Sequence, residues 1–419
     1  MDKHGDHDAG SLPATTLESR SVMVLLPIMG VVLVAFLVIG VAMPVLPLHV
    51  HHGLGLGTVL VGLVAGSQFA AALISRPWAG QYADRSGAKR AVMTGLAVAA
   101  ASGLLYLLSL HVVRAPPASA AILLLGRLLL GGAESFIITG AVSWGLALVD
   151  AQNTGRVIAW VGAAMFAAFA LGAPVGAVLY DVYGFAAIAW ATTLAPLATL
   201  LLVLPLRAVA TQAHARRPGF TRVLAAVWVP GLGSALSSVG FGAITAFVTL
   251  LFADRGWSQG WLPYTAFAAV FILARLALGH LPDTIGGARV ALVCLLIEAA
   301  GLALIWLAPW SALALLGAAL TGLGYSLVYP AFGVQAVLRV PPQSRGLAMG
   351  AYTAFLDLAL GVSGPVLGLI AGETSLAAVF LVSALVALCA VPITLRLRGS
   401  RQNPAPSPQP SSLSSRRTP

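Results

Sequence analysis

The sequence predicts an all-α membrane protein that crosses the bilayer twelve times, as two related halves of six helices, and three observations carry this prediction. Of the 419 residues, 59% are hydrophobic and only 9% are charged, whereas a typical soluble domain has about 25% charged residues. Apolar runs long enough to span a hydrocarbon core about 30 Å thick recur along the whole chain. A short charged pattern also occurs twice at a fixed spacing. A water-soluble surface cannot be built from this composition.

Each apolar run is expected to form one helix, because backbone groups in lipid have to be hydrogen-bonded within their own segment. The N-terminal bundle, residues 21–206, holds the predicted helices 24–47, 58–80, 91–110, 119–148, 156–180 and 185–205. The C-terminal bundle, residues 223–398, holds 223–252, 261–281, 289–308, 311–338, 346–371 and 375–395. Residues 207–222 are the predicted cytoplasmic linker. The polar ends, 1–20 and 399–419, have too few apolar residues to fold and are predicted to be disordered.

The basic residues of the predicted connections lie mainly on one side of the bilayer. Eleven Arg and Lys residues fall on the connections that share a side with the N-terminus, and two, Arg114 and Arg255, fall on the other side. Short cytoplasmic loops carry such an excess, so both termini are predicted to be cytoplasmic, in a bacterial inner membrane. The net charge of +10 is therefore interpreted as a topology signal, and the expected partner is the lipid bilayer, with no nucleic acid.

A charged pattern from the first half recurs in the second half. Its first copy has Arg76, Gly80, Asp84 and Gly87, and its second copy, each member 199 residues later, has Arg275, Gly279, Asp283 and Gly286. A further match, Pro174 with Pro365, has a spacing of 191, and the difference is assigned to the longer connection at 111–119 against 309–311. The two matches indicate a duplication. Transporters built from repeats place substrate sites near the midplane, between the repeats.

The segment 80–90, GQYADRSGAKR, resembles the signature that the major facilitator superfamily carries between its second and third helices. The copy at 279–289 and the run from Gly126 to Gly131 in the fourth helix match two further motifs of that family, so the resemblance covers essentially the whole membrane region. The segments GRLLLGGAES, GYSLVYPAFG and SRGLAMGAYTAFLDLALGVSGP are similar to a branch of uncharacterised bacterial exporters, the arabinose-efflux-permease-like and drug-resistance permeases.

This resemblance implies the family's fold of two pseudo-symmetric six-helix bundles, which rock about a central site to give alternating access. It also implies a monomer that moves a small-molecule substrate, without a cofactor, and that is usually driven by protons in the export branches. The fifth helix departs from the family's antiporter pattern of Gly-Pro followed by paired glycines, since it reads Gly172-Ala-Pro174-Val-Gly176. This departure weakens the support for antiport from that motif.

The charged segment at 80–90 is the candidate gate, together with Gly279 and Asp283 of its second copy. Gly80 is expected to let two helices approach closely, and the carboxylate of Asp84 can cap a helix N-terminus or pair with a cation across the bundle interface. The other candidate gating residues are Arg85, Gly87, Lys89 and Arg90. The alternative is a solvated turn whose charges only set the topology.

Ionisable residues within apolar runs are costly and usually face a cavity or a partner, so the few in this chain are candidates for proton coupling. Arg127 and Glu134 lie on the fourth helix, about 10 Å apart along one face. Arg127 can hold an anionic group or a counter-carboxylate there, and Glu134 can cycle a proton. Asp357, beside glycines and a proline in the eleventh helix, is the second proton-site candidate. Structural hydrogen bonding between helices is the alternative for Arg127 and Glu134.

Three further charged residues lie within apolar runs. Glu298 is in the ninth helix, which the resembled fold places outside the cavity, so a structural role is expected. Arg76 and Arg275 occupy equivalent repeat positions. They are expected either to form pairs that support the gate or to extend their side chains to the cytoplasmic interface.

The candidate substrate contacts are polar or aromatic residues on helices that line the cavity of the resembled fold. They are Phe36, Gln68, Thr139, Tyr325, Tyr329 and Gln335. Packing is the alternative for each aromatic residue. The mixture favours a broad amphipathic site over a sugar site, which needs many polar groups.

Neither histidine cluster, at 49–52 or at 4–7, has the ligand spacing of a structural zinc site, so no metal site is expected. The sequence also contains no phosphate-binding loop and no HExxH or GxSxG in a suitable setting. The chain is therefore predicted not to be an enzyme, and bound ATP is not its expected energy source.

Together these observations predict an exporter of small organic compounds that works by proton-coupled alternating access, with a gate at 80–90 and coupling at Glu134 and Asp357. Two alternatives stay open. The first is a proton-coupled importer or a uniporter of a small metabolite with the same fold. The second is a membrane receptor or scaffold that does not transport.

Overall fold

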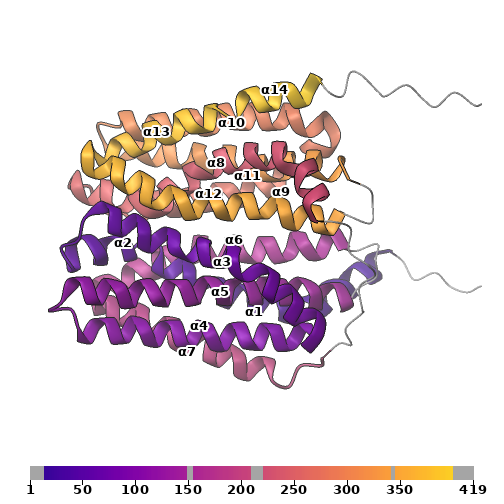
Figure 1. The fold of residues 1–419 in the computed structure, drawn as a ribbon, viewed down its shortest axis with the longest axis horizontal. Helices are drawn as coiled ribbons and strands as arrows, with labels where there is room; N and C mark the ends of the chain where they lie inside the picture. Colours follow the sequence, from indigo (N-terminus) through magenta and orange to yellow (C-terminus); the bar gives the residue numbers. More distant parts are fainter. Residues whose placement is uncertain (1–13, 149–153, 209–219, 341–344, 400–419) are drawn as a thin grey trace, which may run out of the picture.

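The computed structural model describes residues 14–148, 154–208, 220–340 and 345–399, and all regular structure within these ranges is helical. Helices α1 to α7 form one half and α8 to α14 the other, drawn in Figure 1 as a lower and an upper layer. In the described part of the chain, 11 helices are long and apolar enough to cross a membrane, and α9 is a shorter apolar helix. The predicted fold class, an all-α membrane protein of two six-helix bundles, is confirmed.

The N-terminal half contains the first six predicted crossings. Its first crossing is α1 (Ala14–Ala42), which continues through the short α2 (Leu46–Leu48) into the π-helix η1 (His49–Gly53). The other five are α3 (Thr58–Ser86), α4 (Ala88–His111), α5 (Pro116–Leu148), α6 (Thr154–Tyr183) and α7 (Phe185–Val203).

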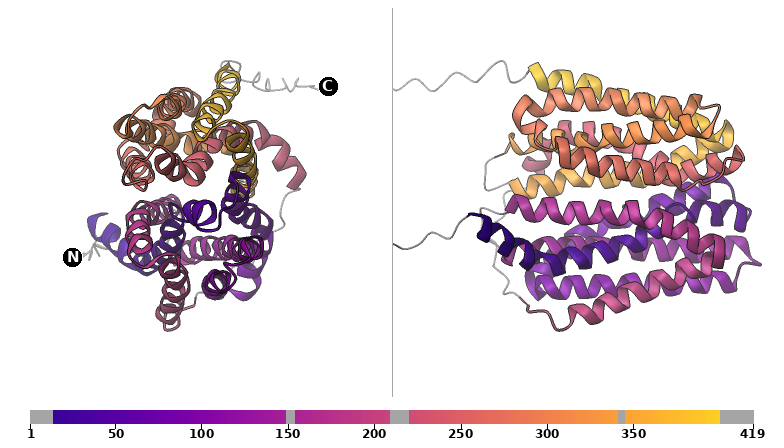
Figure 2. Two further views of the ribbon diagram at one scale, coloured as in Figure 1. Left: turned by 90° about the vertical axis from the view of Figure 1, so that its left-hand side faces the viewer. Right: turned by 180° about the vertical axis from the view of Figure 1, so that it is seen from behind.

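The C-terminal half repeats this arrangement. Its helices are α8 (Phe220–Asp254), α9 (Leu262–Leu278), α10 (Gly287–Leu307), α11 (Ser311–Val337) and α12 (Arg345–Glu373), and its last crossing is divided into α13 (Leu376–Leu388) and α14 (Val391–Gly399). A π-helix, η3 (Pro282–Gly286), lies between α9 and α10. Figure 2 shows the two halves along the helix axes and from behind.

The structure corrects the predicted ends of several segments. Helix α1 begins at Ala14, so the prediction of disorder is wrong from there to residue 20, and α8 begins at Phe220, within the predicted linker. Helix α3 continues through most of the segment predicted as a loop and ends at Ser86. The turn falls at Gly87, whose φ of +98° a side chain would strain, and Gly286 before α10 repeats it with a φ of +95°. The two repeat glycines therefore reverse the chain at equivalent points.

Large apolar side chains cover the outer surface of both halves. Leu202 is 72% exposed, Leu276 70% and Leu201 67%. A soluble protein seldom shows so many exposed leucines in contiguous helices, because each one costs free energy in water. This surface is the one that faces the lipid chains.

The two ends of the helix bundle are named here by residues that they carry. The basic end has Lys89 and Arg398 together with the first residues of α1, and the His49 end has η1 and the start of α3. Odd-numbered crossings run from the basic end to the His49 end, and even-numbered crossings run back. This alternation brings the polar residues of different helices to common levels in the bundle.

The halves meet where α3 packs against α12 and α6 against α9. Helices α3 and α12 touch through glycine: a Cβ placed on Gly62 would overlap the carbonyl oxygen of Gly364, and one on Gly66 would lie 2.8 Å from the carbonyl oxygen of Gly361. The Thr58 hydroxyl donates to the carbonyl of Gly368 over 2.7 Å. Small residues permit such close backbone contact in membranes. The halves are therefore closed against each other toward the His49 end.

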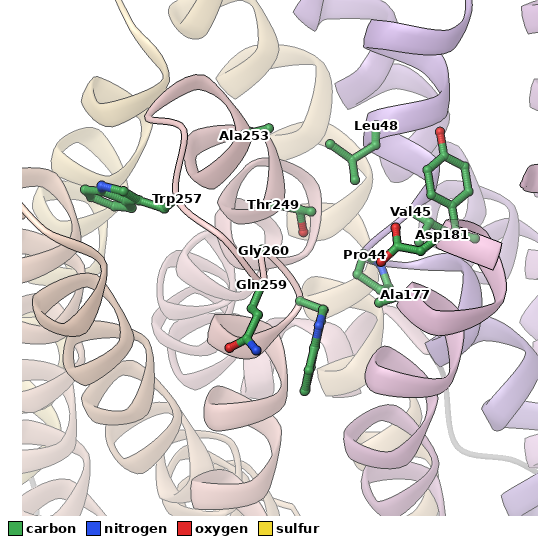
Figure 3. Close-up of a pocket in the computed structure, with 12 residues that line it drawn as sticks. Pro44, Val45, Leu48, Ala177, Asp181, Thr249, Ala253, Trp257, Gln259 and Gly260 are labelled. Carbon is green, nitrogen blue, oxygen red and sulfur yellow. The ribbon is translucent and has the colours of Figure 1, made fainter.

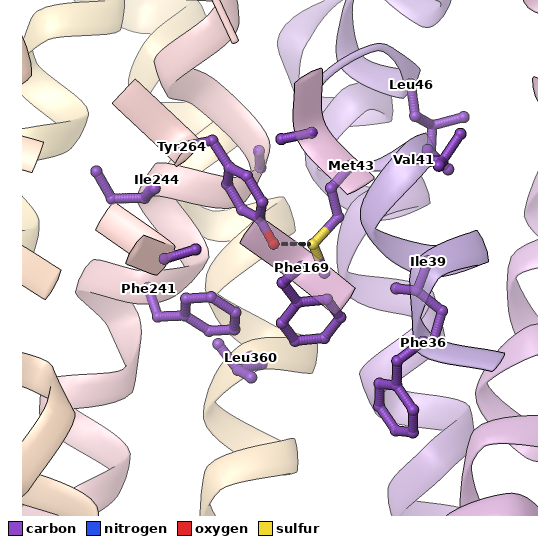
Figure 4. Packing of buried hydrophobic residues seen from close by; sticks show 14 of the residues in the cluster. Phe36, Ile39, Val41, Met43, Leu46, Phe169, Phe241, Ile244, Tyr264 and Leu360 are labelled. Carbon is purple, nitrogen blue, oxygen red and sulfur yellow. Dashed lines mark hydrogen bonds between the residues drawn. The ribbon is translucent and has the colours of Figure 1, made fainter. Parts of the chain in front are cut away.

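A second contact across the halves lies near the same end. The Tyr264 hydroxyl, at the start of α9, donates to the Met43 sulfur just after α1, with 2.7 Å between the two atoms. Figure 4 shows this bond above Phe169 of α6 and Phe241 of α8. Tyr264 is 1% exposed and Met43 4%. This contact and the α3–α12 contact seal the interface on both sides of the bundle.

Candidate substrate and coupling site between the halves

An ion pair joins the two halves inside the bundle. The Arg76 Nε of α3 donates to the Asp357 Oδ2 of α12, with 2.5 Å between the atoms. The Asp357 side chain is 3% exposed and that of Arg76 is 27% exposed. Of the two expectations for Arg76, the structure shows a pair, because the guanidinium reaches across to the other half. Sequence reasoning selected Asp357 as a candidate and missed its partner.

Glu134 on α5 is held by a residue that was predicted to contact substrate. The Gln68 Nε2 of α3 donates to the Glu134 Oε2 over 2.7 Å. Gln68 is fully buried, whereas Glu134 keeps some exposed surface. The bond forms because α5 approaches α3 closely at Gly131, where a Cβ would overlap the carbonyl oxygen of Gln68. Gln68 therefore positions a candidate proton carrier.

Arg127 lies about two turns from Glu134 on α5, toward the His49 end. Its side chain is 2% exposed, and its Nε donates to the carbonyl oxygen of Val64 over a long 3.4 Å. Its Nη1 has no hydrogen-bond partner within the described residues. The counter-carboxylate that the sequence suggested for Arg127 is not found in that part of the chain. The guanidinium is left with spare donors.

Arg275 on α9 lies against aromatic rings instead of a carboxylate. Its Cζ is 5.5 Å from the ring centroid of Phe271 on the same helix and 6.0 Å from that of Phe166 on α6. The two rings stack across the halves with centroids 3.9 Å apart. A cation over an aromatic face gains about 0.5–2 kcal/mol. Arg76 and Arg275 thus occupy equivalent repeat positions with different partners.

The remaining predicted cavity residues divide between packing and polar contact. Phe36 is 1% exposed and packs edge-on against Phe169 with centroids 5.8 Å apart, as the packing alternative expected. Tyr325 is 4% exposed and stacks on Phe241 at 5.5 Å. Tyr329 keeps exposed surface, and its hydroxyl lies 2.6 Å from the Thr353 hydroxyl.

Two predicted cavity residues lie apart from this group. Thr139 is half-buried on α5, nearer the basic end than Glu134. Gln335 is 5% exposed and lies where α11 meets Gly287 at the start of α10, within the C-terminal half.

Glu298 is fully buried and accepts a hydrogen bond from Ser237 of α8, with 2.5 Å between the oxygens. That bond also lies within one half, which supports the structural role expected for Glu298.

A pocket at the His49 end was not foreseen from the sequence. It has a volume of about 230 Å³ and lies between the halves (Figure 3). Its lining includes Leu48, Asp181 and Tyr180 of the N-terminal half and Thr249, Trp257 and Trp261 of the C-terminal half. None of its lining residues belongs to the polar group around Arg76, and no sequence pattern marks the pocket.

Within the described residues, no group of three or more His, Cys, Asp or Glu side chains lies close enough to hold a metal ion. His49 instead stacks on Phe185, with ring centroids 3.9 Å apart and planes inclined by 3°. Residues 4–7 lie outside the described residues.

Comparison with known proteins identifies this architecture. The family model described as Major Facilitator Superfamily matches residues 28–281 and 231–418, which together span nearly all of the chain. The chain belongs to the major facilitator superfamily. It is 43% identical, over 88% of its length and 92% of the relative's, to an uncharacterized MFS-type transporter of Pseudomonas aeruginosa. It is 42% identical, over 92% and 95% of the two lengths, to an uncharacterized MFS-type transporter of Burkholderia mallei.

A solved structure of the same fold is a bacterial homologue of the human lysosomal transporter Spinster, in an inward-facing and occupied conformation. It superimposes with a TM-score of 0.71 at 15% identity and covers 95% of this chain and 100% of its own. At this identity the match shows the fold alone. The chain is thus a multi-pass membrane transporter of this superfamily.

The superfamily signature segment of this transporter has contacts that its sequence did not specify. Gly80 has open space around it, since a Cβ there would meet nothing within 4 Å, so the predicted close helix approach at Gly80 is wrong. The fifth-helix glycines make such an approach instead: a Cβ on Gly172 or Gly176 would overlap the backbone of α1 at Gly40 and Val41. These two glycines therefore let α6 pack closely against α1.

Lys89 of the signature segment binds the end of another helix. Its Nζ donates to the carbonyl oxygens of Leu204, over 2.6 Å, and Leu206, over 2.7 Å, just after α7. A cation is favourable at a helix C-terminus, where carbonyl groups lack intrahelical partners. Lys89 thus joins α4 to α7 within one half.

The Lys89→Met variant should lower the unfolding temperature of the purified transporter, by an amount equivalent to about 1 kcal/mol, because two hydrogen bonds from a charged, partly exposed group are lost. Its transport rate should stay within about twofold of wild type, a difference of about 0.4 kcal/mol. A thermal melt in detergent and a flux assay in liposomes measure the two quantities. Wild-type stability with strongly reduced flux would instead assign Lys89 to the gate. Arg90→Met, the neighbouring cation, is the matched control.

Proposed function

We propose that this transporter exports small organic compounds by proton-coupled alternating access, in a bacterial inner membrane, with both termini in the cytoplasm. The observation that carries the proposal is two carboxylates within the bundle, Glu134 and Asp357, each held by one partner on α3, the helix that contacts the other half. Carboxylates at this depth are costly unless they are paired or change protonation during function. Orientation rests on the basic residues of the connections.

Helix α3 connects both carboxylates to the movement of the halves. Gln68, the partner of Glu134, and Arg76, the partner of Asp357, lie eight residues apart on α3, about 12 Å along its axis. The same helix forms the glycine contact with α12. A proton gained at either carboxylate therefore changes a contact of the helix at which the halves meet.

The Arg76–Asp357 pair links the charge of Asp357 to the contact between the halves. The pair joins α3 to α12 in this structure, in which the halves are closed toward the His49 end, so it stabilises this conformation. A proton on Asp357 removes the attraction between opposite charges, which is large where water is excluded. Protonation then allows the two helices to separate, and deprotonation brings them back.

The Glu134→Gln variant should lose compound-dependent proton movement, because a carboxamide keeps the hydrogen bond with Gln68 but does not take up or release a proton. Purified protein in liposomes that contain a pH-sensitive dye, challenged with cationic, neutral and anionic compounds under an imposed pH gradient, measures this flux. Exchange of labelled for unlabelled compound, which moves no net proton, should continue in the variant. Glu373→Gln, at the exposed end of α12, is the matched control and should behave as wild type.

Each other outcome changes the proposal in a defined way. Equal proton flux in Glu134→Gln and wild type removes Glu134 from the coupling. Compound movement without proton flux in wild type identifies a uniporter. Compound accumulation in the direction of proton entry identifies an importer. An absence of movement for every compound in a panel that also binds the protein supports the receptor or scaffold alternative.

A further inference from the structure

Arg275 is a cation between the halves, and the described part of the chain supplies it with no anionic partner. Its guanidinium is half-buried against Phe166 and Phe271, and within the described residues no carboxylate lies within ion-pair distance of it. A cation–π contact supplies only part of the stabilisation that a charge inside a membrane protein needs. Arg275 therefore has donors left for an anion from outside the chain.

The internal repeat shows which position corresponds, for Arg275, to the acid that pairs with Arg76. Arg76 and Arg275 differ by 199, and the acid paired with Arg76 is Asp357 on α12. The helix equivalent to α12 in the other half is α6, and the spacing of 191 between Pro174 and Pro365 relates Asp357 to Phe166. Phe166 is one of the two rings under the Arg275 guanidinium. The α6–α9 contact thus repeats the α3–α12 contact with the acid replaced by an aromatic ring.

The charges of this region also favour an anion beside Arg275. Apart from the terminal turns of α3 and α12, the facing helices α3, α5, α9 and α12 carry three arginines and two carboxylates: Arg76, Arg127, Arg275, Glu134 and Asp357. Glu298 is separate, because it lies within the C-terminal half and bonds to Ser237. The site therefore has an excess positive charge when both carboxylates are ionised. A cationic compound would be repelled there, and an anion would complete the charge balance.

We infer that the substrate is a small organic anion with an aromatic or apolar body, whose anionic group pairs with Arg275 in the position that Asp357 holds toward Arg76, while its body packs against the half-buried Phe166. This inference names the substrate class and rests on the transport function proposed above. The bound anion supplies the ion pair that the α6–α9 contact lacks. Substrate and Asp357 then act on equivalent contacts of the two halves.

Binding of three compounds with one ring system and different charge tests the inference. The probes are 2-naphthoate, 2-naphthalenemethanol and 2-naphthylmethylamine, and the measurement is the concentration dependence of the unfolding temperature of the full-length protein in detergent. Naphthoate should bind the wild type with an affinity at least about tenfold higher than that of the amine. Arg275→Gln should weaken naphthoate binding by about tenfold to a hundredfold, the loss expected for a hydrogen bond to a charged group.

The chain offers a matched control. Arg255 also lies over an aromatic ring, with its Cζ 5.7 Å from the Trp257 centroid, but it is exposed at the His49 end. Arg255→Gln should bind naphthoate as wild type does. Equal binding of the amine and naphthoate, or naphthoate binding that is unchanged in Arg275→Gln or absent in wild type, overturns the inference.

A second variant tests the repeat argument directly. Phe166→Asp places an acid where the repeat relation expects one, so it should occupy Arg275 and weaken naphthoate binding by at least about tenfold. Naphthoate binding at wild-type affinity in a folded Phe166→Asp protein overturns the inference. If this variant does not fold, Arg275→Gln decides alone. The binding measurement needs no proton gradient, so its failure is distinguishable from a failure of proton coupling.

Discussion

The Asp357→Asn variant should show no substrate-driven proton movement in liposomes and should unfold at a lower temperature than wild type. An asparagine does not carry a proton, and it leaves the Arg76 guanidinium without an anionic partner at the contact of the two halves. Breaking a buried pair costs about 3–5 kcal/mol. Because the Arg76 side chain is 27% exposed, we expect about 2 kcal/mol here. Proton flux and thermal melts of purified protein measure the two effects.

Removal of both charges separates stability from coupling. In the double variant Arg76→Gln with Asp357→Asn neither partner of this pair leaves an unpaired charge, so stability should recover by about 1–3 kcal/mol relative to the sum of the single effects. Proton movement should stay absent. Asp254→Asn, at the exposed end of α8, is the control for a loss of one carboxylate. A double variant that couples protons as wild type does would show that the pair is only structural.

The Gly62→Ala variant should hold the halves apart at the His49 end and reduce the transport rate by at least about tenfold, which corresponds to about 1.4 kcal/mol. A Cβ on Gly62 would overlap the carbonyl oxygen of Gly364, and backbone cannot move aside as the end of a flexible side chain does. Spin labels at Val59 of α3 and Leu369 of α12, both exposed, measure the separation of the two helices. Their distance should increase in the variant.

Gly350→Ala on α12 is the matched control, because a Cβ there would meet nothing within 4 Å. Alanine is favoured over glycine in a helix interior by about 1 kcal/mol, so this control should be at least as stable as wild type. A Gly62→Ala protein with wild-type transport and label distance would refute the role of this contact in closure.

The helices were predictable from the sequence because one physical requirement determines them. A backbone in lipid has to satisfy its own hydrogen bonds over the thickness of the hydrocarbon core, and the start of α3 at Thr58 and of α11 at Ser311 agree with their predicted first residues. The predicted end of α3 was wrong, and this error also has a physical cause. Charged residues end an apolar run but not a helix, so α3 continues to Ser86 and only Gly87 reverses the chain.

The partners of the candidate residues were not predictable. Arg76 and Asp357 are 281 residues apart, and Gln68 and Glu134 are 66 apart, so no periodicity links them. The free-energy cost of an ionisable side chain in the membrane indicated the candidate residues. The approach of α3 to α5 and α12 decided which of them are in contact. Gly80 shows the opposite failure: the residue type predicted a close contact that the structure places at Gly62 and Gly131.

The glycine crossing of α3 and α12 also bears on the energy needed to run the cycle. Because backbone meets backbone at Gly62 and Gly364, separating the helices uncovers few apolar side chains there. The balance between the two conformations then depends on a small number of polar contacts. A difference in ligand affinity of tenfold, about 1.4 kcal/mol, shifts such a balance substantially. Under the proposed mechanism, a weakly bound compound and a change of protonation at one carboxylate would therefore shift this balance.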